Sequence, residues 1–140
     1  MDAQFSDLGL LSNMGLSNQT GELIGAVKRG LPVSSFEVLA SSLGVSEARL
    51  AKVVGISGTT LTRRKREGRL TQDEGEHVLR IAGLLEQAAG LFGSLEAAGE
   101  WFGTPNLSLA DATPLDYADT ELGGREVENL LGRIEYGVYS

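Results

Sequence analysis

Apolar residues recur along the chain at the spacing of helical faces, and polar residues that cap helices or form turns separate them. Residues 34–43 place four apolar positions on one face: Phe36, Leu39, Ala40 and Leu43. Residues 71–92 carry a longer apolar stripe: Val78, Leu79, Ala82, Leu85, Ala89 and Phe92. No segment of the sequence shows the strong apolar–polar alternation of a strand. The pattern therefore predicts an all-α fold.

Capping and breaking residues set the expected limits of the helices. Thr71 and Glu74 have the spacing of a capping box and mark the start of the long helix. Further helices are expected over 20–29, 34–43, 46–54, 57–67, 94–102 and 124–136, with a short one after Pro114. Residues 1–19 lack sustained periodicity, so we expect a loose leader there rather than a helix.

Charge is divided unevenly along the 140 residues, whose formal net charge is -7. Residues 1–80 hold 10 basic and 9 acidic side chains, whereas residues 81–140 hold 2 basic and 10 acidic ones. Seven bases and one acid lie between Arg49 and Arg69. An asymmetry of this size indicates two regions that face different partners, although two solvated surfaces would also give it.

The basic segment coincides with the pattern of a helix-turn-helix over residues 47–66, "EARLAKVVGISGTTLTRRKR". Such a unit needs a small residue where its helices cross, a glycine in the turn and apolar contacts between the helices. Ala51 and Gly55 supply the first two. The apolar contacts are expected from Leu50, Val54, Ile56 and Leu61. Arg64 occupies one position that is usually apolar, which is a departure from the pattern.

In this geometry the N-terminal part of the second helix enters the major groove of DNA. The residues expected nearest the base edges are Ser57, Gly58, Thr59, Thr62 and Arg63. Arg63 is the best candidate for a two-point contact with guanine. Phosphate contacts are expected mainly from Arg49, Lys52, Arg64, Lys65, Arg66 and Arg69. Taken alone, the basic run would also fit a solvated helix end whose cations favour the helix dipole.

Several classes of protein find no support in the sequence. Cysteine is absent, which excludes disulfides and thiolate metal sites and fits a reducing cytosol. His77 is the single histidine, and no nucleophile motif or phosphate-binding glycine loop accompanies it. We therefore predict no catalytic residue, metal ligand or cofactor, and no enzyme activity. No signal peptide is recognisable and no apolar run approaches the ~20 residues of a membrane helix, so a cytoplasmic location without a membrane partner is expected.

Five motifs over residues 30–140 give the chain a resemblance to a known family. These are "TLTRR", "GRLTQDE", "AGEWFGTPN", "TPLDY" and "LLGRIEYG", in this order. In order and spacing they resemble the Xre/MbcA/ParS family of bacterial antitoxins. Two departures are small: Ala110-Asp111 stands where the family often has a glycine, and Phe102 follows the tryptophan where an aliphatic residue is frequent.

The resemblance implies a two-gene toxin–antitoxin system. The cognate toxin would carry a RES domain and deplete NAD, and the antitoxin would bind it through its C-terminal domain. The N-terminal domain would bind operator DNA and repress the operon, as a homodimer or higher oligomer. The implied domains are a leader (1–19), a helix-turn-helix domain (20–70), a linking or dimerisation helix (71–93) and a toxin-binding domain (94–140).

Two expectations concern the C-terminal half. Trp101 is expected to anchor its core, with Leu107, Leu109 and Leu115 as the walls of that core. The tail, "GRIEYGVYS", is expected to insert into or beside the NAD pocket of the toxin, because tyrosines suit interface anchors. Its contact residues would be Arg133, Glu135, Tyr136, Gly137, Tyr139 and Ser140.

One alternative remains from the sequence. A stand-alone helix-turn-helix transcription regulator would use its C-terminal domain to sense a ligand or partner. An adjacent reading frame for a RES domain would favour the antitoxin, and its absence would favour the regulator.

Overall fold

The computed structural model of the protein describes residues 9–137, and all regular elements within that range are helical. In chain order they are α1 (Leu10–Asn13), α2 (Thr20–Arg29), α3 (Val33–Leu43), α4 (Glu47–Val54), α5 (Gly58–Glu67), α6 (Gln72–Phe92), α7 (Leu95–Phe102), the 3-10 helix η1 (Leu107–Leu109), α8 (Pro114–Tyr117) and α9 (Glu121–Gly137). The predicted all-α class is confirmed.

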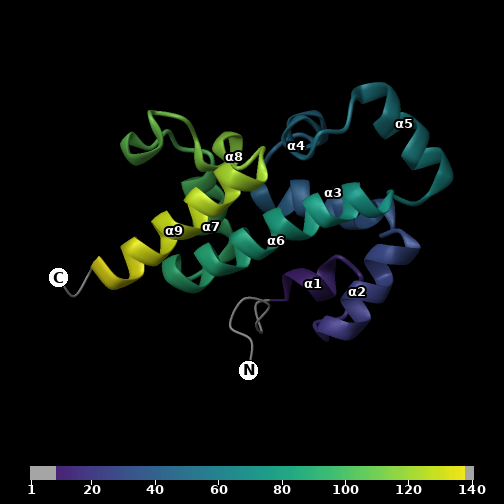
Figure 1. Ribbon diagram of the computed structural model, residues 1–140, viewed down its shortest axis with the longest axis horizontal. Helices are drawn as coiled ribbons and strands as arrows, with labels where there is room; N and C mark the ends of the chain where they lie inside the picture. Colours follow the sequence, from purple (N-terminus) through teal and green to yellow (C-terminus); the bar gives the residue numbers. More distant parts are fainter. Residues whose placement is uncertain (1–8, 138–140) are drawn as a thin grey trace.

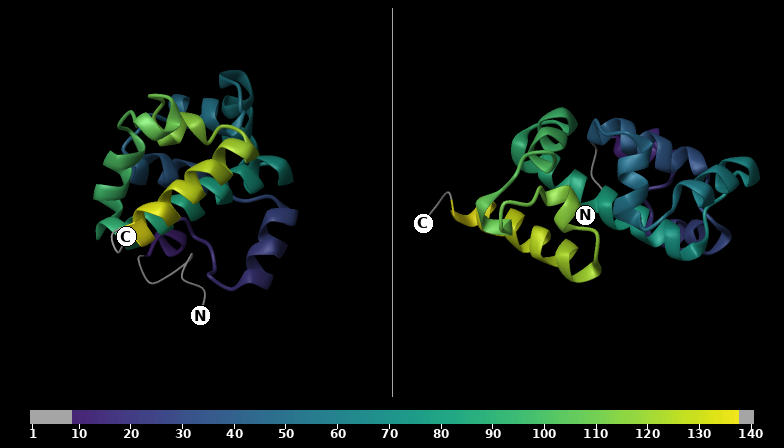
Figure 2. Two further views of the ribbon diagram at one scale, coloured as in Figure 1. Left: turned by 60° about the vertical axis from the view of Figure 1, so that its left-hand side comes forward. Right: turned by 90° about the horizontal axis from the view of Figure 1, so that it is seen from above.

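Helix α6 runs through the middle of the molecule, with α2 on one side and α4 on the other, while α7 and α9 cover its C-terminal part (Figure 1). It begins at the predicted capping box, in which Thr71 Oγ1 accepts from Glu74 N at 3.2 Å and Glu74 Oε1 accepts from Thr71 N at 2.9 Å. It ends at Gly93, whose left-handed φ of 97° favours glycine. Two views place α5 and the C-terminal end of α9 at opposite ends of the molecule (Figures 1 and 2).

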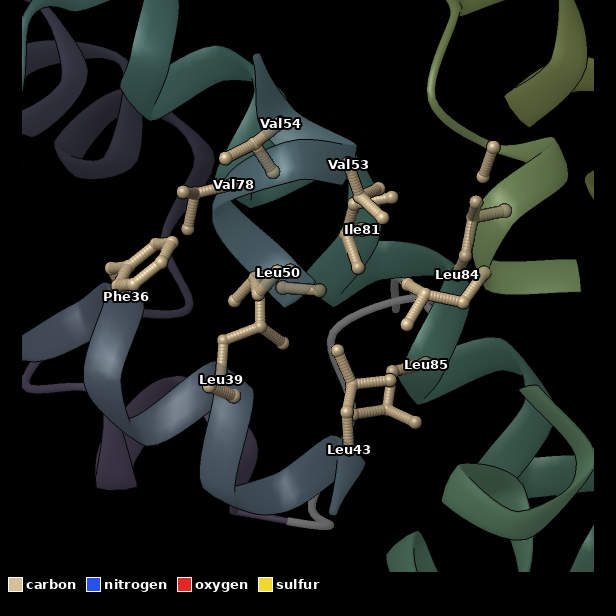
Figure 3. Packing of buried hydrophobic residues seen from close by; sticks show 14 of the residues in the cluster. Phe36, Leu39, Leu43, Leu50, Val53, Val54, Val78, Ile81, Leu84 and Leu85 are labelled. Carbon is tan, nitrogen blue, oxygen red and sulfur yellow. The ribbon is translucent and has the colours of Figure 1, made fainter. Parts of the chain in front are cut away.

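Side chains from three helices meet in the core shown in Figure 3. They are all buried: Phe36, Leu39 and Leu43 of α3; Leu50, Val53 and Val54 of α4; Val78, Ile81, Leu84 and Leu85 of α6. The same helix α6 also packs against α7 and α9. Residues 71–93 therefore do more than link two domains, because they form a core that both halves of the chain share.

The expectation of a loose leader is wrong for its described part. Leu10, Leu11 and Met14 are buried almost completely, and α1 packs against α3 and α6. A helix of four residues has almost no stability of its own, so burial of these side chains holds it in place. Local periodicity could not reveal it, since the stabilising partners lie far along the chain. Residues 1–8 lie outside the described range.

Two expectations about the C-terminal core also need correction. Trp101 is only partly buried, while its neighbour Phe102 is fully buried. Their rings meet edge to face, with centroids 5.2 Å apart. Leu107 is 86% exposed because only Leu109 of the short 3-10 helix turns inward. The burial of Leu109 and Leu115 is as predicted.

Helices α3 and α7 approach each other closely at Gly99. A Cβ atom at this position would lie 3.0 Å from the carbonyl oxygen of Leu43, so glycine permits the contact. Among the described residues no single helix is long and apolar enough to cross a membrane, and α6 with α7 meets that condition only as a pair bent by 114°.

Candidate DNA-facing and C-terminal surfaces

The predicted helix-turn-helix is formed by α4 and α5. Ser46 and Ser57 cap the two helices by accepting hydrogen bonds from the backbone N–H groups of Arg49 and Thr60, at 3.1 and 3.2 Å. Gly55 makes the turn with a left-handed φ of 80°. The small crossing residue and the inner side of α5 are buried: Ala51, Ile56 and Leu61. The arrangement leaves the remaining faces of α5 open to solvent.

The residues predicted to lie nearest the base edges all belong to the exposed surface: Ser57, Gly58, Thr59, Thr62 and Arg63. The hydroxyl of Thr62 donates to the carbonyl oxygen of Gly58 at 3.1 Å, within the helix itself. Arg63 is therefore the one long side chain of this set. Because the others are short, Arg63 is the residue of this set whose side chain has the length that a two-point base contact requires.

Arg64 does not face outward as a phosphate contact would require. Its Nε and Nη2 atoms donate to the two carboxylate oxygens of Glu74 at 2.8 and 3.0 Å, and Nη1 donates to Glu67 at 3.2 Å. Its side chain is only 13% exposed. The hydrogen bond to Glu74 raises the pKa of Arg64 above its ordinary value. Desolvation alone would raise the pKa of Glu74, but the hydrogen bonds from Arg64 and Thr71 lower it.

Two other predicted phosphate contacts, Arg69 and Lys65, have partners within the protein. Arg69 donates to the carbonyl oxygen of Gly30 at 2.9 Å. Lys65 pairs with Glu47 and Glu37, and the hydrogen bond to Glu47 raises the pKa of Lys65. Both side chains belong to exposed residues, so they remain within reach of a partner.

Arg49 reaches from α4 to α8, where its Nη2 atom lies 3.3 Å from Thr113 Oγ1 and 3.4 Å from Asp116 Oδ2. Within residues 9–137, no ion pair or side-chain hydrogen bond involves Lys52, Arg63 or Arg66. These three exposed cations are the best placed for contact with a nucleic acid.

The C-terminal surface has a different character. Residues 87–137 carry nine acidic and two basic side chains, and all eleven are exposed. At the end of α9, Arg133, Glu135 and Tyr136 are exposed, with 73% of Tyr136 open to solvent. Gly137 is the last described residue, so the predicted contacts of Tyr139 and Ser140 lie outside the described range.

Sequence reasoning missed two exposed apolar residues in this half. Leu107 lies on η1, and Leu122 lies at the start of α9 with 69% of its surface exposed. The sequence analysis had placed Leu107 in the core. Leu122 is flanked by acidic residues and glycines, so the sequence around it does not indicate an exposed apolar surface. The two exposed leucines and Tyr136 add apolar surface to the acidic half, as the buried core of a protein–protein interface requires.

Glu86 was also missed. It lies in α6 with 1% of its surface exposed, and neither carboxylate oxygen has a hydrogen-bond partner. Burial raises the pKa of Glu86 to about 7. The signal in the sequence is a single acid within "RIAGLLEQAAGLF", where apolar residues occupy nearly every face of the helix.

His77 has a structural contact. Its Nδ1 atom lies 3.0 Å from the carbonyl oxygen of Val54, which joins α6 to the end of α4. In the part of the chain that the structure describes, no three His, Asp or Glu side chains are grouped as a metal site would require.

Two family models match this chain, and the boundary between them lies close to the point where the charge changes, between residues 80 and 81. The model of the antitoxin Xre-like helix-turn-helix domain matches residues 22–83. The model of the antitoxin Xre/MbcA/ParS C-terminal toxin-binding domain matches residues 87–137.

Three relatives carry the name "Antitoxin Xre". The one from Yersinia enterocolitica is 32% identical over 120 residues, or 84% of this chain and 81% of the relative. The one from Photorhabdus laumondii is 30% identical over 134 residues, or 94% of this chain and 90% of the relative. The one from Pseudomonas putida is 30% identical over 79 residues, or 56% of this chain and 50% of the relative.

Proposed function

This chain belongs to the Xre family of antitoxins, and from that premise we propose that it neutralises a RES-domain toxin that depletes NAD and represses its own operon. The observation that carries the proposal is the succession of a helix-turn-helix domain and a toxin-binding domain in one chain. In this proposed role the protein acts by binding its partners and not by catalysis. It acts in the cytoplasm, where its operator is found.

Operator binding is supported by the exposed face of α5. The recognition helix presents Arg63 among short polar residues, and Arg66 and Lys52 remain unpaired among the described residues. Cations that are not already paired with carboxylates are free to replace the counterions of phosphate groups. We propose that Arg63 contacts a base, that Arg66 and Lys52 contact phosphates, and that Arg64 positions the helix.

Toxin binding is proposed for the acidic surface of residues 87–137. A protein that binds the anionic NAD needs an electropositive pocket, and an acidic partner is attracted to such a pocket. Tyr136 is an exposed residue near the C-terminal end of α9. This end of α9 lies at the end of the molecule opposite α5 (Figure 1). A surface placed there would leave the recognition helix accessible, so toxin and DNA would bind without overlap.

The test is co-expression of this chain with the neighbouring reading frame. We expect a RES-domain protein to co-purify with it, and the purified RES protein alone to consume NAD. Adding this chain should stop that consumption in proportion to the amount added. A RES protein that is neither bound nor inhibited would contradict the proposed toxin.

Repression is tested separately with a promoter–reporter fusion in cells that express this chain alone. The alternative, a stand-alone regulator, predicts repression without any neighbouring toxin gene. The match of residues 87–137 to a toxin-binding domain favours the antitoxin.

A further inference from the structure

We propose that α8 restrains DNA binding, because it holds Arg49 of α4 in an ion pair that competes with contact between Arg49 and a DNA phosphate. The inference rests on the proposed operator binding. Arg49 Nη2 lies 3.4 Å from Asp116 Oδ2 and 3.3 Å from the hydroxyl oxygen of Thr113, the residue that caps α8. Within residues 9–137, this is the one ion pair that joins the helix-turn-helix region to the toxin-binding region.

Arg49 lies where a helix-turn-helix meets the DNA backbone. The first helix of such a unit crosses the backbone, and here that helix is α4. Arg49 and Lys52 are three residues apart in α4, so their side chains start from the same face of the helix. Lys52 is exposed and is one of the proposed phosphate contacts. Helix α8 lies beside α4, on the side of the molecule that also carries α5 (Figures 1 and 2).

The groups that α8 offers to Arg49 resemble those of a phosphate. Asp116 supplies an anionic oxygen and Thr113 a neutral one, and a guanidinium group binds carboxylates and phosphates in the same way. DNA binding therefore either breaks the ion pair or proceeds without Arg49. In both cases the protein gains less from releasing the counterions of DNA than it would with Arg49 unpaired, because a freed Asp116 attracts a cation of its own.

Further acids of the C-terminal half oppose a phosphate at the present position of Arg49. Arg49 borders a groove of about 770 Å³ between α3, the start of α4 and α7. Glu96 and Glu100 of α7 line the same groove, and both are exposed. Like charges repel at short range, so these carboxylates and Asp116 would disfavour a phosphate there. Contact with phosphate therefore requires the side chain of Arg49 to turn away from α8.

The ion pair can open while α8 stays in place. The side chains of Arg49 and Asp116 are 39% and 56% exposed, and exposed ion pairs are weak. Helix α8 is held by other contacts, because Thr113 accepts a hydrogen bond from the backbone N–H of Asp116 at 3.1 Å and Leu115 is fully buried. The contact is therefore a restraint that lowers affinity for DNA rather than a block that prevents binding.

The restraint is tested with the full chain, without toxin, by fluorescence anisotropy on two duplexes of equal length: the promoter sequence and a scrambled sequence. Asp116→Asn should raise the affinity for both duplexes about two- to fivefold. It should also steepen the slope of log affinity against log salt by up to about one unit. Asp119→Asn is the matched control, since Asp119 is also exposed but makes no ion pair within residues 9–137. The control should leave the slope unchanged.

A second pair of variants shows whether the effect acts through Arg49. In the Arg49→Ala background, Asp116→Asn should give no gain beyond that of Asp119→Asn. Thermal melting checks that all variants stay folded. An Asp116→Asn protein with the affinity and slope of the parent, an equal gain in Asp119→Asn, or a gain that persists without Arg49 would overturn the proposal.

The two duplexes separate this inference from the proposed function on which it rests. Phosphate contacts carry no sequence information, so the scrambled duplex tests the restraint by itself. A parent that binds the promoter no better than the scrambled duplex would count against operator binding, while the comparison of Asp116→Asn with Asp119→Asn would still decide the role of α8.

Discussion

Arg64 of the recognition helix is held by Glu74 of the central helix through two hydrogen bonds of 2.8 and 3.0 Å. The same carboxylate caps α6, because it also accepts from the backbone N–H of Thr71. One side chain of α6 therefore fixes both the start of its own helix and the end of α5. The pair therefore joins α5 directly to α6, in addition to the turn that joins α5 to α4.

The first prediction separates positioning from phosphate contact. Arg64→Ala should destabilise the fold by about 1–3 kcal/mol, because charge-assisted hydrogen bonds are lost and Glu74 loses a partner. Operator affinity should fall, while the slope of log affinity against log salt stays nearly constant. Arg66→Ala is the control, and it should reduce that slope by about one unit. Equal changes in slope for both variants would place Arg64 at a phosphate after all.

A second prediction concerns base readout. Arg63→Ala should reduce discrimination between the operator and a sequence with one altered half-site base pair by about 1–3 kcal/mol. The effect is expected to be concentrated at one base pair, since the neighbouring side chains are short. Binding is measured by fluorescence anisotropy with a panel of single substitutions. Toxin neutralisation should be unchanged, and a loss of neutralisation would show that the variant damages the fold.

The third prediction is a pH dependence of stability that arises from Glu86. Its folded-state pKa of about 7 lies above the ordinary value of 4.5. Between these two pH values the folded protein retains a proton that the unfolded chain has released, so stability should fall as the pH rises. The total loss should be about 3 kcal/mol, complete near pH 7.

Urea unfolding at a series of pH values measures this dependence. Glu86→Gln removes the titrating group and should flatten the curve over that interval. Glu126→Gln is the control, because Glu126 is exposed on α9. A Glu86→Gln protein with the pH dependence of the parent would show that other groups cause it.

The fourth prediction follows from the two neighbouring aromatic residues of α7. Phe102→Ala should destabilise the protein by about 3–5 kcal/mol, the range for a fully buried aromatic ring. Trp101→Ala should destabilise it less, because part of that ring faces solvent. Chemical unfolding of the two variants gives the comparison. The opposite order would mean that Trp101 carries the core of this half.

The fifth prediction concerns the C-terminal tail. A chain that ends at Glu135 should fold, dimerise and bind the operator like the full chain, because 73% of Tyr136 is exposed to solvent. Its inhibition of the NAD-consuming toxin should fall sharply. The substitution Tyr117→Ala, at another exposed tyrosine of this half, serves as a control for a general loss of aromatic surface. Equal inhibition by the truncated and full chains would leave the helical faces of residues 94–131 as the toxin-binding surface.

Features that depend on nearby residues were predictable from the sequence. The caps at Ser46, Ser57 and Ser94 and the capping box of α6 involve residues three apart, and the structure has each of them. The glycine turn of the helix-turn-helix is likewise a local signal. All of these interactions form within one helical turn, so a short stretch of sequence contains both partners.

Features that depend on distant partners were not predictable. Leu10 and Met14 look like residues of an ordinary polar leader until α3 and α6 are placed against them. The helix-turn-helix pattern places Arg64, unlike Arg63 and Arg66, at a usually apolar position, but it does not identify Glu74, ten residues along the chain, as the partner of Arg64. Glu86 stands out only when the packing on every side of α6 is known.

The shared helix α6 has a consequence for inheritance. The two matched regions meet between residues 83 and 87, in the middle of this helix, where Leu84, Leu85 and Glu86 are all buried. Recombination between two antitoxin genes at this point would join the N-terminal part of one hydrophobic core to the C-terminal part of another. The side chains of these two parts would not be matched for packing. The specificities for operator and toxin should therefore be inherited together. Functional chimaeras should have their crossover point outside α6.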